Sequence, residues 1–427
     1  MKLFRIGVLL FFMSFLGSVY SQYNKIELDS IVAVWKDTTK EDSVRLNAFM
    51  EISYNDILKK SDFDDALYLA KSNKDSLIAK EIENTAYYIK YDDSVHSVWK
   101  DKTKSDTDRI DAFLKLVRYD NLNYSTKAYK LAEKINDKKR MALVLSYRAY
   151  IPNFSSIDKI KDLRKALDLF EEINFDSIDI MYTYSDLAYC YSEISNYENA
   201  LSSLRKGILL ANKPKDYLMF YQRFAEIYIK TKNFEKAKEN YLKIINTISK
   251  DSSLKKDMNL IGWVVTAWIR LGHTFFEAIK CEEALNAFKN AEKIIDSTKI
   301  VYWTNGAYRN IYLGMGKAYS KLKMHENVIE HYKKGLKYCK GVRQKNRFSL
   351  AFAEHYYSIN DKEKTYYYID KYLNSINTDN IPDKIKLRDL SKGFYRLGHL
   401  CEEMGDYPRA LKFYLKSNDF RKKDENL

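Results

Sequence analysis

The chain has 427 residues, of which 46% are hydrophobic and 15% aromatic, so it is long and apolar enough to bury a sizeable core. Four prolines and 13 glycines are too few for a sheet-rich protein with many tight turns, and no low-complexity tract indicates a long disordered region. Composition therefore favours an all-α fold.

The charge balance is basic, with 72 Lys and Arg against 58 Asp and Glu, which gives a formal net charge of +14. A basic balance often indicates nucleic acid or an anionic membrane surface as a partner. Here the lysines are spread over nearly every expected helix and often stand beside acidic residues, as in residues 234–240. This pattern is typical of solvated helix faces. We therefore predict no nucleic-acid partner.

The chain begins with the pattern of a secretory signal peptide. Lys2 and Arg5 form a positive start, residues 6–16 form an apolar run, and small residues follow near residue 21. The run is shorter than the roughly 20 apolar residues that a membrane-spanning helix needs. No cysteine stands near the cleavage point to accept a lipid. We predict a signal peptide at residues 1–22, a mature chain without a membrane span, and a periplasmic or secreted location.

Two segments of the amino-terminal third repeat each other at an offset of 64 residues. Among the positions that recur in both copies are Trp35, Asp37, Arg45 and Phe49 in the first, and Trp99, Asp101, Arg109 and Phe113 in the second. Asp42 and Asp106 are expected to start helices, because their side chains can accept hydrogen bonds from free backbone N–H groups. The simplest interpretation is that the tryptophans and arginines fix the packing of helical hairpins.

From residue 181 onward, small and aromatic residues recur at fixed offsets. The copies carry these residues in order: Leu187, Ala188, Tyr191 and Ala200; Phe224, Ala225, Tyr228 and Ala237; Trp268, Leu271, Gly272, Phe275, Ala284, Phe288 and Ala291; Tyr312, Met315, Gly316, Tyr319 and Val328; Phe352, Ala353 and Tyr356; Leu397, Gly398, Cys401 and Ala410. Small residues at these offsets allow two helices to approach closely, and the aromatic residues fill the space beside them. A chain of generic amphipathic helices would show the apolar period without these fixed small positions.

This spacing resembles the tetratricopeptide repeat, a helix–turn–helix unit of about 34 residues. The resemblance implies a right-handed superhelical solenoid of antiparallel helix pairs, whose concave groove is lined by the first helix of each pair. Carrying the family's variable groove positions onto the clear copies gives eight candidate peptide-binding residues: Tyr189, Gln222, Glu226, Lys230, His273, Asn310, Lys317 and Lys321.

Residues that could carry chemistry do not form a recognisable site in the sequence. No nucleophile elbow, phosphate-binding loop, zinc-protease motif or dinucleotide fingerprint is present. Cys190, Cys281, Cys339 and Cys401 lack the spacing of a metal site and allow three disulfide pairings, but two of them fall at expected core positions, so we expect buried free thiols. We predict no enzyme activity, no cofactor and no metal.

The expected organisation is a signal peptide at residues 1–22, divergent helical repeats at residues 23–178 and a tetratricopeptide array at residues 179–427. We expect a non-enzymatic scaffold that binds a protein or peptide outside the cytoplasm. The amino-terminal duplication also resembles the segment that precedes the repeats in exported tetratricopeptide proteins and sensor-kinase input regions. The alternative is therefore a stand-alone or truncated sensory input region of a signal-transduction protein.

Overall fold

The computed structural model describes residues 25–52, 60–73, 79, 82–83, 94–115, 122–151, 154–175, 178–251, 254, 258–298, 304–339, 341–376 and 384–425. The predicted signal peptide lies outside these ranges. The chain divides into two compact units, one formed by residues 83–278 and one formed by residues 1–82 with 279–427. The predicted boundary after residue 178 falls inside the first of these units and stays a prediction.

Within the unit of residues 83–278, regular structure is helical wherever the chain is described. Residues 94–100 are helical, and the elements after them are α6 (Asp106–Lys115), α7 (Leu122–Lys134), α8 (Lys138–Tyr147), the short 3₁₀ helix η1 (Arg148–Tyr150), α9 (Ser156–Glu172), α10 (Ile178–Glu193), α11 (Tyr197–Ile208), α12 (Pro214–Lys230), α13 (Phe234–Lys250) and α14 (Met258–Glu277).

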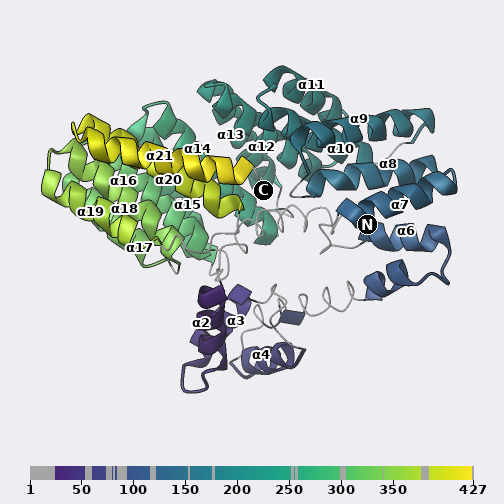
Figure 1. Ribbon diagram of the computed structural model, residues 1–427, viewed down its shortest axis with the longest axis horizontal. Helices are drawn as coiled ribbons and strands as arrows, with labels where there is room; N and C mark the ends of the chain where they lie inside the picture. Colours follow the sequence, from purple (N-terminus) through teal and green to yellow (C-terminus); the bar gives the residue numbers. More distant parts are fainter. Residues whose placement is uncertain are drawn as a thin grey trace. The chain divides into compact units, whose positions relative to one another are not determined.

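The second unit is built in the same way. Its described elements are α2 (Lys25–Lys36), α3 (Asp42–Ile52), α4 (Lys60–Ser72), α15 (Cys281–Thr298), α16 (Thr304–Lys321), α17 (His325–Leu336), α18 (Val342–Ser358), α19 (Lys362–Asn374), α20 (Lys384–Glu403) and α21 (Tyr407–Glu425). Figure 1 shows α16 to α21, in green to yellow, as neighbouring antiparallel rods. Each unit thus confirms the all-α repeat fold of antiparallel helix pairs. Among the described residues, no helix is long and apolar enough to cross a bilayer.

Consecutive helices form hairpins, and the first helices of successive hairpins also touch. The pairs α10–α11, α12–α13, α16–α17, α18–α19 and α20–α21 are in contact, as are α10 with α12, α16 with α18, and α18 with α20. The first helices of neighbouring hairpins therefore form one continuous layer inside each unit. This layer contains the predicted groove positions.

One turn geometry closes these hairpins. In five of them, the residue just before the N-cap of the second helix has a positive φ of 58° to 77°: Ser195, Lys232, Lys323, Asn360 and Gly405. In four of them the following residue caps the second helix, since the side chains of Asn196, Asn233, Asp361 and Asp406 accept hydrogen bonds of 3.0–3.3 Å from the backbone N–H three residues later. Met324, which follows Lys323, makes no such side-chain bond. Such a cap satisfies a backbone donor that the helix leaves free.

The amino-terminal duplication is a duplication of contacts as well as of sequence. Arg45 Nε donates to the carbonyl oxygen of Trp35 at 3.2 Å, and its guanidinium lies 5.3 Å from the indole ring. Arg109 repeats both contacts with Trp99, at 3.3 Å and 5.6 Å. Both tryptophans are buried, and α3 and α6 begin at the predicted residues Asp42 and Asp106. In both copies, the arginine holds the carboxyl end of one helix against the start of the next.

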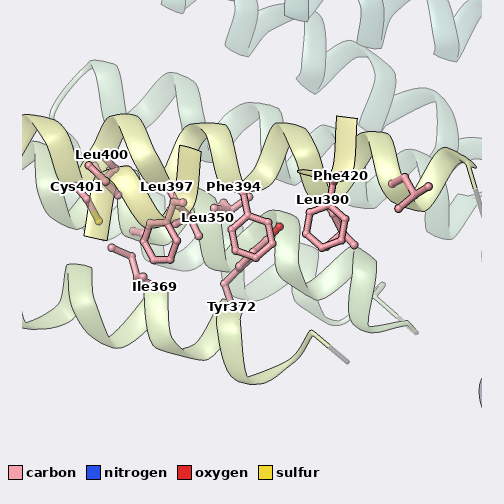
Figure 2. Close-up of a cluster of buried hydrophobic side chains, with 13 residues drawn as sticks. Leu350, Ile369, Tyr372, Leu390, Phe394, Leu397, Leu400, Cys401 and Phe420 are labelled. Carbon is pink, nitrogen blue, oxygen red and sulfur yellow. The ribbon is translucent and has the colours of Figure 1, made fainter. Parts of the chain in front are cut away.

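Large rings opposite small residues fill the core between the hairpins. Figure 2 shows the core of α18 to α21, where Phe394 stacks on Phe420 at 5.6 Å and meets the edge of Tyr372 at 6.1 Å. Between hairpins, Gly207 on α11 packs against the fully buried ring of Phe220 on α12. The small residues therefore set how closely adjacent helices approach. Cys190, Cys281, Cys339 and Cys401 are buried and form no disulfide bonds.

Candidate functional site

The eight predicted groove residues lie on four helices in the two units. Tyr189 is on α10, Gln222, Glu226 and Lys230 are on α12, and His273 is on α14; Asn310, Lys317 and Lys321 are on α16. We describe the residues on α10 and α12 as one surface and those on α16 with its neighbours as another. His273 is half-buried.

On the first surface, polar side chains connect α10 with α12. The Arg223 guanidinium lies over the Tyr189 ring at 4.6 Å, and Arg223 Nη1 is 3.8 Å from Glu226 Oε2. Gln222 Nε2 donates to Glu226 Oε1 at 2.9 Å. Lys230 Nζ donates to Ser192 Oγ at 3.0 Å and pairs with a glutamate of α10 at 3.2 Å. Residues 222, 226 and 230 share one face of α12 because their spacing is one helical turn.

A phenol and a carboxylate extend this surface toward the preceding turn. Tyr150, which lies in η1, donates a hydrogen bond from its hydroxyl to Asp186 Oδ2 at 2.7 Å. Desolvation raises the pKa of Asp186 to about 6 and raises the pKa of Tyr150 well above its ordinary value. Yet Tyr150 is 45% exposed and Tyr189 is 44% exposed. Both phenol rings are therefore accessible to solvent and to a ligand.

We call Tyr150, Asp186, Tyr189, Gln222, Arg223, Glu226 and Lys230 the α10–α12 surface. Sequence analysis identified four of its members and missed Tyr150, Asp186 and Arg223. Asp186 and Arg223 lie one helical turn before the predicted residues Tyr189 and Glu226. A prediction that took in more positions on each helix would have included both of them. Tyr150 lies outside every repeat copy, and no sequence signal placed it beside α10.

On the second surface, the layer of α16, α18 and α20 carries a ladder of charged groups. Arg347 Nη1 donates to Asn310 Oδ1 at 3.3 Å. Arg396 Nε donates to Glu354 Oε1 at 2.7 Å, and Arg343 forms an ion pair with Asp389. Each contact joins one first helix to the next. Of the predicted residues on α16, Asn310 takes part in this ladder.

Lys317 and Lys321 share a face of α16 with Asn310, since they follow it by seven and eleven residues. Lys317 is half-buried and Lys321 is exposed. The charge of Lys321 acts on the Cys281 thiol, but burial dominates there and raises the pKa of that thiol. A raised pKa keeps the thiol protonated and therefore a poor nucleophile.

The structure also brings together two histidines that the sequence separates. His325 Nδ1 and His355 Nε2 lie 2.7 Å apart, and Ser320 Oγ lies 2.8 Å from His355 Nδ1. Burial and the neighbouring histidine lower the pKa of His355 to about 4. In the described ranges, no group of three or more His, Cys, Asp or Glu side chains has the arrangement of a metal site.

Comparison with known proteins identifies the repeats. The family model for the tetratricopeptide repeat matches residues 182–214, 220–250, 310–340 and 391–424. The copy predicted at residues 268–291 lies between the second and third matches and remains a prediction. No curated protein sequence matches the chain.

Solved structures share the fold at low identity. Aspartyl phosphate phosphatase F from Bacillus subtilis is 14% identical with a TM-score of 0.50, over 89% of this chain and 94% of that one. The apo form of the quorum sensor NprR from B. thuringiensis is 18% identical with a TM-score of 0.48, over 83% and 98% of the two chains. A tetratricopeptide repeat protein from Parabacteroides merdae is 12% identical with a TM-score of 0.46, over 66% and 93%. The family model thus identifies four tetratricopeptide repeats in the chain, within an all-α fold of antiparallel helix pairs.

Proposed function

We propose that the chain is a non-enzymatic scaffold that binds an extended peptide segment of a partner protein on the first helices of its repeats. The observation that carries the proposal is the α10–α12 surface, where contacts between aromatic rings and paired charges join successive hairpins. Stacked helical repeats use their concave surfaces for recognition.

The chemistry of this surface suits a polypeptide. An extended peptide presents alternating N–H donors and carbonyl acceptors, so its binding site needs groups of both kinds. Asp186 and Glu226 supply acceptors, whereas Arg223 and Lys230 supply donors. The exposed faces of Tyr150 and Tyr189 offer rigid apolar area, which is characteristic of residues that dominate binding energies.

We further propose that binding takes place outside the cytoplasm, in the periplasm or after secretion. Support comes from the signal-peptide pattern of residues 1–22, with its positive start and short apolar run. If the chain instead serves as a sensory input region, the same surface would receive the peptide signal.

A peptide-display selection on the full chain tests the function. Linear peptides of random sequence are selected, and the affinity of each recovered peptide is measured by fluorescence anisotropy for the parent chain and for Tyr189→Ala. Loss of a central aromatic contact at an interface costs about 2 kcal/mol, so we expect Kd to rise about 30-fold.

The matched control is Tyr367→Ala, which removes the same ring from a 58%-exposed position on α19, a second helix of its hairpin. Its affinity should stay within about twofold of the parent, because exposed positions away from an interface contribute little to binding. Recovery of no specific peptide, or equal effects of the two substitutions, would show that the α10–α12 surface is not a peptide site.

A further inference from the structure

Arg309, on α16, is a buried cation without a counter-charge. Its side chain is only 9% exposed, and its Nε has no hydrogen-bond partner. Among the described residues, no carboxylate lies within ion-pair distance of it. Arginine does not lose its proton in proteins, so the charge stays in place. Natural proteins rarely bury an arginine without a partner, because its lost hydration is then not compensated.

Three further arginines lie on the neighbouring first helices. Arg343, Arg347 and Arg396 belong to α18 and α20, and together with Arg309 they form what we call the arginine cluster. Desolvation lowers the pKa of both Arg309 and Arg347, and neighbouring guanidinium charges add to it: that of Arg343 at Arg309, and those of Arg309, Arg343 and Arg396 at Arg347. The cluster is therefore crowded with like charges.

The carboxylates close to the cluster are already engaged. Asp389 pairs with Arg343, and Glu354 pairs with Arg396. Arg347 has a neutral partner, the Asn310 side-chain oxygen at 3.3 Å. Arg309 and Arg347 are thus the two members of the cluster that form no ion pair with a described residue, and the charge of Arg309 acts on Arg347.

We propose that Arg309 and Arg347 together bind a carboxylate of the partner peptide, supplied by an aspartate or glutamate side chain. A guanidinium is planar and donates two parallel hydrogen bonds to a carboxylate. A carboxylate of the ligand would therefore supply the missing negative charge in the geometry that an arginine binds. The inference rests on the proposed peptide-binding function and specifies an acidic ligand for the second unit.

The surroundings favour a peptide over a small free anion. Asn310, Lys317 and Lys321 follow one face of α16 in succession, and Arg347 meets this face at Asn310 through its 3.3 Å hydrogen bond. Positive charge therefore continues along the helix beyond the pair of arginines. A segment with several acidic residues can engage this row, whereas a single small anion can engage only part of it.

The test uses the full chain and a fluorescein-labelled peptide of alternating Glu and Ser, about ten residues long. Anisotropy is measured at about 50 mM salt, where attraction between charges is only partly screened, and the same peptide with Gln in place of Glu is the neutral comparison. We expect the acidic peptide to bind and the neutral peptide to bind at least about tenfold more weakly, since bonds to charged groups are the stronger ones.

The decisive variant is Arg309→Met, which keeps a long side chain but removes the buried charge. Its affinity for the acidic peptide should fall at least about tenfold, as expected for loss of a charge-assisted hydrogen bond. Arg205→Met on α11 makes the same exchange at an exposed arginine of the other unit and should change the affinity by less than about twofold.

Thermal unfolding of Arg309→Met without peptide separates binding from folding. Removing an uncompensated buried charge should leave the midpoint unchanged or raise it, so weaker binding cannot be ascribed to a damaged fold. Unchanged affinity of Arg309→Met overturns the proposal. A second result would also overturn the proposal: the acidic peptide does not bind, and inorganic phosphate raises the unfolding midpoint of the parent but not of Arg309→Met. The cluster would then be a site for a free anion. In either case, displayed peptides that depend on Tyr189 would still support the proposed function.

Discussion

The packing of Gly207 against Phe220 makes a quantitative prediction about the contact between successive hairpins. A Cβ added at Gly207 would lie 2.7 Å from Phe220 Cε1, 2.8 Å from Phe220 Cζ and 2.9 Å from Tyr184 Cβ. Ordinary contacts begin at about 3.4 Å, so each neighbour would have to move by roughly 0.5–0.7 Å. The Phe220 ring is fully buried and Tyr184 Cβ is fixed to its backbone, so neither can turn aside.

We therefore expect Gly207→Ala to destabilise the unit of residues 83–278. Overpacking a core costs about 1–3 kcal/mol, while Ala is favoured over Gly inside a helix by at most about 1 kcal/mol. The net loss should be about 1–2 kcal/mol. It can be measured as a lower urea midpoint, with faster hydrogen exchange in α11 and α12 to locate the change.

The control substitution is Gly306→Ala on α16. A Cβ there meets only Arg309 Nη2, at an ordinary 3.7 Å, so the helix preference for Ala should appear alone and leave stability equal or higher. Phe220→Leu removes the ring that makes two of the three close contacts. It should therefore lower the free energy of unfolding less in the Gly207→Ala background than in the parent chain. The reasoning is refuted if Gly207→Ala is as stable as Gly306→Ala.

Two further predictions concern protonation and backbone strain. The pKa of His355 is lowered to about 4 from 6.5, so its contribution to stability is fully present above pH 6.5 and is lost as the pH falls toward 4. The loss of stability should reach about 2 kcal/mol by pH 5, and His355→Gln should abolish this pH dependence. The control His399→Gln, at a side chain that is 55% exposed, should leave the pH dependence unchanged. Equal acid sensitivity of the two variants would show that His355 is not the group responsible. Ile279 is 84% exposed and has a φ of 61°, a backbone region that costs a β-branched residue about 1–2 kcal/mol. Ile279→Gly should therefore raise the unfolding midpoint. An unchanged or lower midpoint would show that this strain is absent.

The repeat pattern predicted the fold because small residues and rings recur at offsets that only paired helices use. Gly405 and the cap residues Asn196 and Asp361 are also recognisable in the sequence, since these residue types favour turns and caps. Lys232 and Lys323 adopt the same left-handed backbone as Gly405 without such a signal. At these two positions, the packing of the helices on either side overrides the local preference.

The candidate surfaces were only partly predictable for a related reason. Family positions located Gln222, Glu226 and Asn310, because each lies on a predictable face of a predicted helix. The contact of Tyr150 with Asp186 joins residues 36 positions apart through a turn that follows no repeat. The isolation of Arg309 depends on which carboxylates its neighbours have already paired with, and that depends on several helices at once.

The shared turn geometry of the hairpins has a consequence for how the chain folds. Each turn contains a left-handed residue, and four of the five are also closed by a cap bond that reaches only three residues ahead, so a hairpin forms from contacts that are close in sequence. Such local topology favours rapid folding, and folding can start at any hairpin and spread to its neighbours. A hairpin could therefore be gained or lost in evolution at the cost of repacking only the helices on either side of it.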